Sequence, residues 1–231
     1  MRFLGLVLAL VCLSSVPSQA GEEPAYWLWA GHNVQAVPES SVLYIYQGNV
    51  RATDKGVTFH SKGMHPFPLR NRQIFLVFRL YGAFPDAHDV VKLYKNLATR
   101  WEQHGPKVLG LQIDFDAATS KLGPYADYLE VLRRTLPDDK KLSITGLGDW
   151  TSLENPAQLK RLTNIADEVV FQMYQGKTAF PDKSTYIRAL EKTGIPFKLG
   201  LLANDNPAYI QTGLEKSRGF NGLILFPDAA L

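Results

Sequence analysis

The run LGLQIDFDAAT, residues 109–119, places three polar side chains at alternate positions of an otherwise apolar segment. Gln112, Asp114 and Asp116 would share one face of a β-strand, whereas the apolar residues between them would point the other way. Alternate residues of a strand lie about 7 Å apart at Cα, so two carboxylates there cannot both ionise without cost. A carboxyl with a raised pKa beside an ionised one suits general acid catalysis on a glycosidic bond. Asp114 and Asp116 are therefore the candidate catalytic residues.

Other interpretations of this pair stay open. Asp116 could cap the next element while Asp114 pairs with a buried cation, or both could hold a divalent cation through oxygen ligands. The five histidines lie outside the predicted strand ends, and no HExxH, GxSxG, Walker or GxGxxG motif occurs in a fitting place. We therefore expect neither a metal site nor a cofactor.

Aromatic, amide and charged residues also stand at or near the ends of other predicted strands. Aromatic faces stack on the C–H groups of pyranose rings, while amides and acids hydrogen-bond to hydroxyl groups, and Arg79 would supply a counter-charge for the aspartates. Each of these residues also has a structural interpretation, as a core side chain, a loop cap or a partner of a backbone carbonyl. The candidate substrate-binding residues are Trp27, Trp29, Arg79, Gln112, Asp149, Trp150, Gln172 and Tyr174.

The elements that must position these residues alternate along the chain. Short apolar runs predict eight strands, at 26–30, 42–47, 74–80, 108–114, 142–145, 168–174, 197–201 and 223–226. Helical spacing of apolar residues predicts helices at 86–104, 122–136, 156–165, 183–192 and 207–217, and residues 55–60 suggest a small hairpin arm. This order predicts an α/β fold, a (β/α)₈ TIM-type barrel that lacks or shortens its first and last helices. An open doubly wound sheet is the alternative.

The N-terminus has the pattern of a signal peptide. Arg2 precedes an apolar run over 3–16, and the small residues Ser18 and Ala20 predict cleavage after Ala20. The run is shorter than the roughly 20 residues that span a membrane, so we expect no stable membrane insertion after cleavage. Residues 1–20 are then a signal peptide, 21–231 form one barrel domain, and the protein is periplasmic or secreted. The one cysteine, Cys12, lies in the signal, where Val11 before it disfavours a lipoprotein.

The net charge by itself argues neither for nor against a nucleic-acid partner, so the distribution of basic residues decides the expectation. The 231 residues are 45% hydrophobic and 20% charged, as in ordinary globular proteins, and the formal net charge is +3. The densest basic stretches, Arg70-Asn71-Arg72 and Lys140-Lys141, are short and are better interpreted as solvated surface. We therefore expect no nucleic-acid partner.

The strings GLQIDFDAAT, SITGLGDW and DEVVFQMYQG, in this order, resemble domain-of-unknown-function family 3142, an exported bacterial family without an established activity. More distantly, the layout is similar to the family-eighteen chitinase-like glycoside hydrolase barrels, which carry a DxxDxDxE motif at the fourth strand. That resemblance implies Asp116 at the acid position, Asp114 at the Asp that orients the substrate's acetamido group, and Tyr174 at a tyrosine after the sixth strand. The chain departs from the pattern because Asp116 is one methylene shorter than Glu and Gln112 replaces an acid.

These observations predict a glycoside-hydrolase-like barrel that acts on an envelope or extracellular polysaccharide. Asp116 would be the general acid, and Asp114 would orient the substrate or stabilise developing positive charge. The alternative is a non-catalytic barrel that binds a glycan or a partner protein through its strand-end aromatic residues. Whether the protein is an enzyme is thus left open by the sequence.

Overall fold

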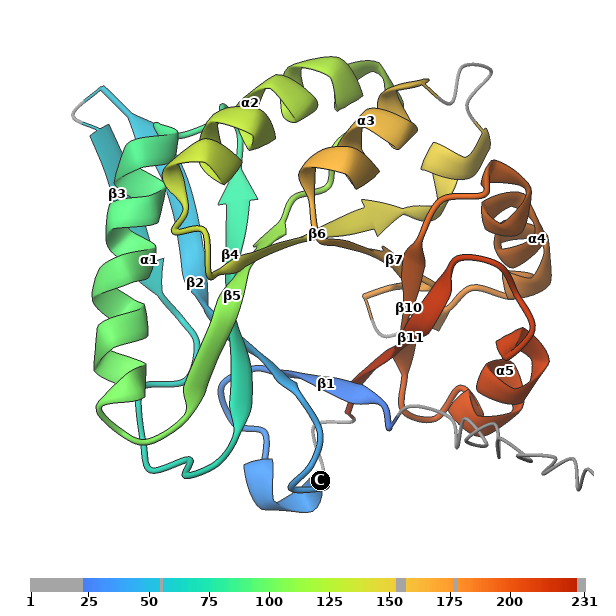
Figure 1. Cartoon of the computed structure of the whole chain (residues 1–231), viewed down its shortest axis with the longest axis horizontal. Helices are drawn as coiled ribbons and strands as arrows, with labels where there is room; N and C mark the ends of the chain where they lie inside the picture. The colour runs from blue at the N-terminus through green and yellow to red at the C-terminus, as the bar shows by residue number, and fades with distance from the viewer. Residues whose placement is uncertain (1–22, 55, 153–156, 177, 228–231) are drawn as a thin grey trace, which may run out of the picture.

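Eight parallel strands close into a barrel in the computed structural model, which describes residues 23–54, 56–152, 157–176 and 178–227 (Figure 1). Strand β1 pairs with β11 on one side and with β2 on the other, and this double pairing closes the sheet. The predicted barrel is therefore confirmed, and the open sheet is excluded. The predicted signal peptide lies outside the described residues. The barrel strands are β1 (Ala25–Leu28), β2 (Leu43–Thr53), β4 (Gln73–Tyr81), β5 (Lys107–Asp114), β6 (Lys141–Leu147), β7 (Glu168–Gln172), β10 (Phe197–Leu202) and β11 (Phe220–Phe226).

Helices cover the outside of the barrel from β4 onward (Figure 1). They are α1 (Ala87–Glu102), α2 (Leu122–Thr135), α3 (Ala157–Ile165), α4 (Lys183–Thr193) and α5 (Pro207–Leu214). Between β1 and β2 the chain forms only the 3-10 turn η1 (Val34–Ala36), which confirms the prediction that the first helix is absent or short. After β2 it turns back as β3 (Gly56–Ser61), which pairs antiparallel with β2 and is the predicted hairpin arm. Two further 3-10 turns are η2 (Thr119–Lys121) and η3 (Gly148–Ser152).

The sixth predicted strand is shorter than expected. Strand β7 ends at Gln172, and the next residues form a two-stranded hairpin of β8 (Tyr174–Gln175) and β9 (Thr178–Ala179). Met173 occupies the break: its N–H donates to the carbonyl of Gly200, and its own carbonyl accepts from the N–H of Phe180. The hairpin therefore starts at the end of the barrel where the strands finish.

Two apolar clusters follow from strand alternation, because successive side chains point to opposite faces of the sheet. The larger cluster lies between the strands and the helices and includes Leu111 and Ile113, the apolar set of the opening motif. The smaller one fills the barrel interior with Trp27, Tyr44 and Phe75 among others. At Gly200 a Cβ atom would lie 2.4 Å from the Trp27 ring, so this glycine makes room for the indole.

Candidate functional site

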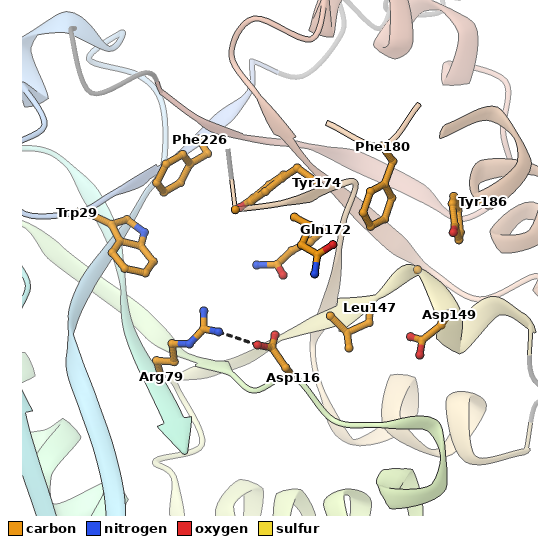
Figure 2. A pocket seen from close by; sticks show the side chains of 13 residues that line it. Trp29, Arg79, Asp116, Leu147, Asp149, Gln172, Tyr174, Phe180, Tyr186 and Phe226 are labelled. Carbon is orange, nitrogen blue, oxygen red and sulfur yellow. Dashed lines mark hydrogen bonds and ion pairs between the residues drawn. The ribbon is translucent and has the colours of Figure 1, made fainter. Parts of the chain in front are cut away.

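A cavity of about 760 Å³ lies at the carboxyl ends of the strands, the end at which the active sites of such barrels lie (Figure 2). Figure 2 shows Arg79 and Asp116 on one side of it and Gln172 and Tyr174 facing them. Six of the predicted site residues line this mouth cavity: Trp29, Arg79, Asp116, Asp149, Gln172 and Tyr174.

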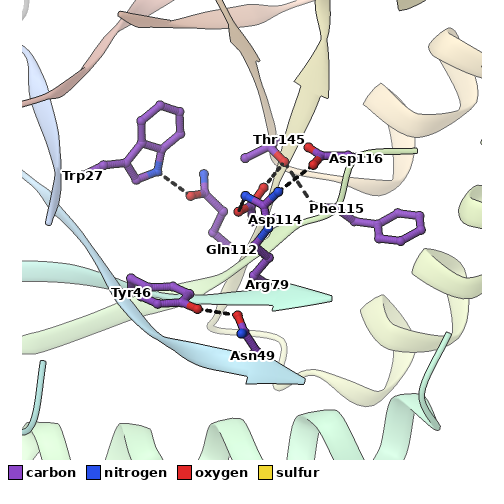
Figure 3. Close-up of polar contacts among 9 residues, drawn as sticks. All are labelled: Trp27, Tyr46, Asn49, Arg79, Gln112, Asp114, Phe115, Asp116 and Thr145. Atoms are coloured by element: carbon purple, nitrogen blue, oxygen red, sulfur yellow. Dashed lines mark hydrogen bonds and ion pairs between the residues drawn. The ribbon is translucent and has the colours of Figure 1, made fainter. Parts of the chain in front are cut away.

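Arg79 joins both aspartates of the opening motif (Figure 3). Its Nη1 donates to Oδ2 of Asp114 at 3.0 Å, and its Nη2 donates to Oδ2 of Asp116 at 2.6 Å. Thr145 adds a hydrogen bond of 3.1 Å from its Oγ1 to the other oxygen of Asp114. The Asp114 side chain is 5% exposed, whereas that of Asp116 is 48% exposed. Arg79 is therefore the counter-charge that the sequence predicted, and Asp116 is the carboxylate that a ligand can reach.

Burial and neighbouring charges shift the pKa values of Asp114 and Arg79. Burial raises the pKa of Asp114; Arg79 opposes the shift, and Asp116 adds to it. Burial alone would lower the pKa of Arg79, but the negative charges of Asp114 and Asp116 outweigh it and raise that pKa. One carboxyl pKa of the pair thus rises, as expected. The shift belongs to the covered Asp114, whereas Asp116, which the resemblance predicts as the acid, is half exposed.

Trp27 and Gln112 form a layer beneath the mouth cavity (Figure 3). The Nε1 of Trp27 donates to Oε1 of Gln112 at 2.6 Å, and Nε2 of Gln112 donates to Oγ of Ser143 at 2.9 Å. Both side chains are buried, and together with Asp114 they line a small inner space of about 20 Å³. Their hydrogen bonds fix the floor of the site, so we assign them to positioning rather than to direct contact with a ligand.

The rim position predicted for Trp150 is wrong. The turn η3 carries this indole away from the mouth into the outer core, where its Nε1 donates to the carbonyl of Ala117 at 2.8 Å. Its ring packs edge-on against Tyr125 and Phe171, with centroids 6.4 and 6.1 Å away. The side chain is fully buried, so it stabilises the fold beside the site and does not line the cavity.

Aromatic side chains stand on two sides of the polar centre (Figure 2). On one side Trp29 stacks on Tyr46 with centroids 4.1 Å apart and meets Phe226 edge-on at 5.9 Å. On the other side Phe180 and Tyr186 lie 5.3 Å apart. Figure 2 shows Arg79, Asp116 and Gln172 between these two groups.

Sequence reasoning missed the three lining aromatic residues Phe180, Tyr186 and Phe226. Phe226 ends β11, so the strand-end rule that selected the other candidates could have found it. Phe180 and Tyr186 belong to the β9–α4 connection and to α4, where no periodic signal marks a residue that faces the cavity. Tyr174 was found; burial and Asp114 raise its pKa, so its hydroxyl stays protonated and can donate.

Two further findings concern the described residues only. Their histidine, aspartate and glutamate side chains do not gather into groups of three or more that could hold a metal ion. None of the helices they form is both long enough and apolar enough to cross a membrane.

Comparison with known proteins gives a family match for part of the chain and similar folds for most of it. Residues 70–182 match the family model described as a domain of unknown function, DUF3142, which agrees with the predicted family, although the resemblance predicts a match over nearly the whole mature chain. No curated protein matches the chain. Among solved structures, concanavalin B is similar with a TM-score of 0.61 at 14% identity, over 91% of this chain and 94% of that one.

Two xylanase and α-amylase inhibitor proteins are similar as well. The inhibitor XAIP-II from Scadoxus multiflorus has a TM-score of 0.54 at 15% identity, over 88% of this chain and 93% of its own. The inhibitor XAIP-I, crystallised as a complex with trehalose, has a TM-score of 0.54 at 14% identity, over 89% and 93%. At these identities the likeness shows the fold alone, which is a TIM-type barrel.

Proposed function

We propose that this protein binds a glycan chain in the mouth cavity. The observation that carries the proposal is the arrangement of aromatic rings on both sides of a polar centre, Trp29 and Phe226 facing Phe180 and Tyr186 across Arg79 and Asp116. Sugar rings present apolar C–H faces and a rim of hydroxyl groups. A chain of several sugars would therefore stack on both aromatic groups and hydrogen-bond to the charged and amide side chains between them.

The size and the exposure of the groups support this ligand class. A volume of about 760 Å³ lies within the range of small-molecule sites, roughly 300–1,000 Å³. Asp116 offers acceptor oxygens that are half exposed, and Gln172 offers both a donor and acceptors. One similar barrel, XAIP-I, was crystallised with the disaccharide trehalose. Binding of a saccharide by this chain is our proposal.

The ion pair of Asp116 favours binding over catalysis. A general acid must hold a proton when the substrate arrives, whereas Arg79 engages the carboxylate form of Asp116 at 2.6 Å. Asp114, whose pKa burial does raise, lies under the cavity and is held by Arg79 and Thr145. Asp114 thus lies away from the space where a leaving-group oxygen would sit, and Asp116, which a ligand can reach, is engaged by Arg79.

Hydrolysis is the second candidate, and the position of Asp116 favours it. This carboxylate follows β5 directly and faces the cavity, at the acid position of the family-eighteen motif. In that function a bound sugar would displace Arg79 from Asp116, and the freed carboxylate would take up a proton from water. The resulting acid would protonate the glycosidic oxygen as its C–O bond to the anomeric carbon breaks, and water would add to that carbon and release a proton. Asp114 would orient the substrate, and the substrate would be an envelope or extracellular polysaccharide met by a periplasmic or secreted protein.

A glycan array with product analysis tests both functions. We expect Trp29→Ala to lose binding by about tenfold or more, which corresponds to 1.4 kcal/mol. The matched control is Tyr209→Ala, because Tyr209 is a 78% exposed aromatic residue of α5 that does not line the cavity. Circular dichroism verifies that both variants fold.

The outcomes separate the two functions. If Trp29→Ala binds every glycan as tightly as the wild-type protein, the binding site is not this cavity. If the wild-type protein releases shorter products from a bound glycan and Asp116→Asn does not, the protein is a hydrolase. Retained binding without products from either protein supports the non-catalytic barrel.

A further inference from the structure

A second cavity, of about 680 Å³, lies at the opposite end of the barrel from the mouth. It is formed by the segments 34–40 and 68–72, which lead into the amino ends of β2 and β4. The polar residues that line it are Gln35, Glu39, Ser40, Arg70, Asn71 and Arg72. It shares no lining residue with the mouth cavity among the residues described.

Arg72 is the unusual residue of this basal cavity. It is only 7% exposed, although the sequence suggested a solvated basic stretch; Arg70 and Asn71 are exposed, and for Arg72 that interpretation is wrong. Its Nε and Nη2 atoms are covered, and neither has a hydrogen-bond partner within the described part of the chain. Leaving buried donors of a charged group unpaired costs stability, so proteins usually pair them.

The backbone holds Arg72 in this place. Its N–H donates to the carbonyl of Leu69 at 3.2 Å, and its carbonyl accepts from the N–H of Lys107, the first residue of β5, at 2.8 Å. The residue is thus bonded to the barrel frame on both sides, and its burial is part of the fold.

Two acidic side chains lie near Arg72 without pairing with it in the described residues. Burial lowers the pKa of Arg72, and the negative charges of Glu39 and Glu23 oppose that shift from a distance. Neither carboxylate forms an ion pair with Arg72 within the described residues. Glu39 lines the cavity with Arg70 and Arg72, and Glu23 is hydrogen-bonded to the lining residue Ser40, so two carboxylates lie near two guanidinium groups. What sets Arg72 apart is that its covered donors remain without a partner among the described residues.

We propose that the basal cavity binds the anionic group of a small molecule, a carboxylate or a phosphate, through Arg72 and Arg70. A guanidinium group donates charge-assisted hydrogen bonds to both oxyanions, and the amides of Gln35 and Asn71 supply further donors on the cavity wall. The proposal is independent of the glycan site, because it rests on other residues at the other end of the barrel.

Thermal unfolding with inorganic phosphate and with acetate as separate probes tests the proposal. Sodium chloride at equal ionic strength serves as the reference for general salt effects. At ten times its dissociation constant, the anion that binds should raise the melting temperature of the wild-type protein by about 3–6 °C. The anion that gives the larger rise identifies the group, and the rise should vanish in Arg72→Met.

Arg134→Met is the matched control, because it removes the same charge from the exposed last turn of α2. It should keep the full anion-dependent rise. If Arg72→Met does not fold, the ¹⁵Nε resonance of Arg72 in the wild-type protein provides the measurement, and it should move with added anion but not with chloride. An equal rise in wild type and Arg72→Met, or a resonance that neither anion moves, overturns the proposal.

Discussion

Arg79 and Arg72 lie on and just before the same strand, β4, at opposite ends of the barrel, and their surroundings differ completely. Arg79 is partly exposed and donates to two carboxylates, and its neighbours raise its pKa. Arg72 is almost fully covered, two of its nitrogens have no partner among the described residues, and burial lowers its pKa. Arg79 is thus paired within the protein, whereas Arg72 keeps covered donors without a partner among the described residues. A charged residue that lines a cavity indicates a ligand most strongly when its hydrogen-bond donors have no partner within the protein.

The largest expected effect is that of Arg79→Met. Asp114 would keep its burial but lose its cation, and breaking a buried pair in this way costs about 3–5 kcal/mol. The free energy of unfolding from urea denaturation at neutral pH measures the loss.

The pH dependence of that variant sharpens the prediction. A carboxyl whose pKa is raised in the folded state binds a proton more readily there than in the unfolded state. Its ionisation therefore lowers the free energy of unfolding as pH rises from the ordinary pKa of 3.8 through the raised pKa of the folded state. Without Arg79 the pKa of Asp114 rises further, and the deficit of Arg79→Met should shrink on acidification. A deficit that is constant with pH would show that Asp114 is not its source.

The next effect is that of Trp27→Phe, which tests the layer between the two ends. The substitution keeps most of the ring but removes the donor to Oε1 of the buried Gln112. An unsatisfied buried acceptor costs about 1–3 kcal/mol, so the midpoint of urea unfolding should fall. Ser143→Ala removes the partner on the other side of Gln112 and should cost a similar amount. An unchanged midpoint in both variants would mean that this layer does not fix the floor of the site.

Asp116→Asn should have a small effect on stability. Its carboxylate is 48% exposed, so the short contact with Arg79 is screened by solvent, and exposed pairs contribute at most about 1 kcal/mol. We expect urea unfolding to change by less than that, while glycan binding or hydrolysis changes more. A loss as large as that of Arg79→Met would show that Asp116 belongs to the structural cluster and not to the ligand site.

The smallest effect, and the one of opposite sign, is expected for Arg72→Met. Replacing an unpaired buried cation by an apolar side chain of similar length should leave the free energy of unfolding unchanged or raise it by about 1 kcal/mol in anion-free buffer. Urea denaturation in a chloride buffer measures it. A large destabilisation would mean that Arg72 has a structural role that the cavity does not explain.

The fold was predictable because its signals are local. Strands buried on both faces are short apolar runs, and the intervening helices show apolar spacing, so the barrel order followed from the sequence. The sixth strand was overextended because Met173 looks like a strand residue, and only its bonds to Gly200 and Phe180 show that the strand has ended.

The site was predictable in part for the same reason. Strand-end residues such as Arg79, Asp116 and Tyr174 were found because position in a barrel strand fixes the direction of the side chain. Trp150 was misplaced because a 3-10 turn follows its strand, and such turns do not keep the alternation of a strand. Arg72 could not be recognised as buried, since only the fold brings the distant segment 34–40 to the cavity that Arg72 lines.

The aromatic side chains that fill the barrel interior determine whether a small molecule could pass from one end of the barrel to the other. Tyr44 and Phe75 stack at 4.7 Å with nearly parallel rings, and Trp27 lies edge-on to Tyr44 at 6.4 Å. These rings make the barrel a partition rather than a conduit. A small molecule could not pass through the barrel from the mouth cavity to the basal cavity. A ligand of either cavity would therefore enter and leave at the same end, and occupancy of one cavity would not require occupancy of the other.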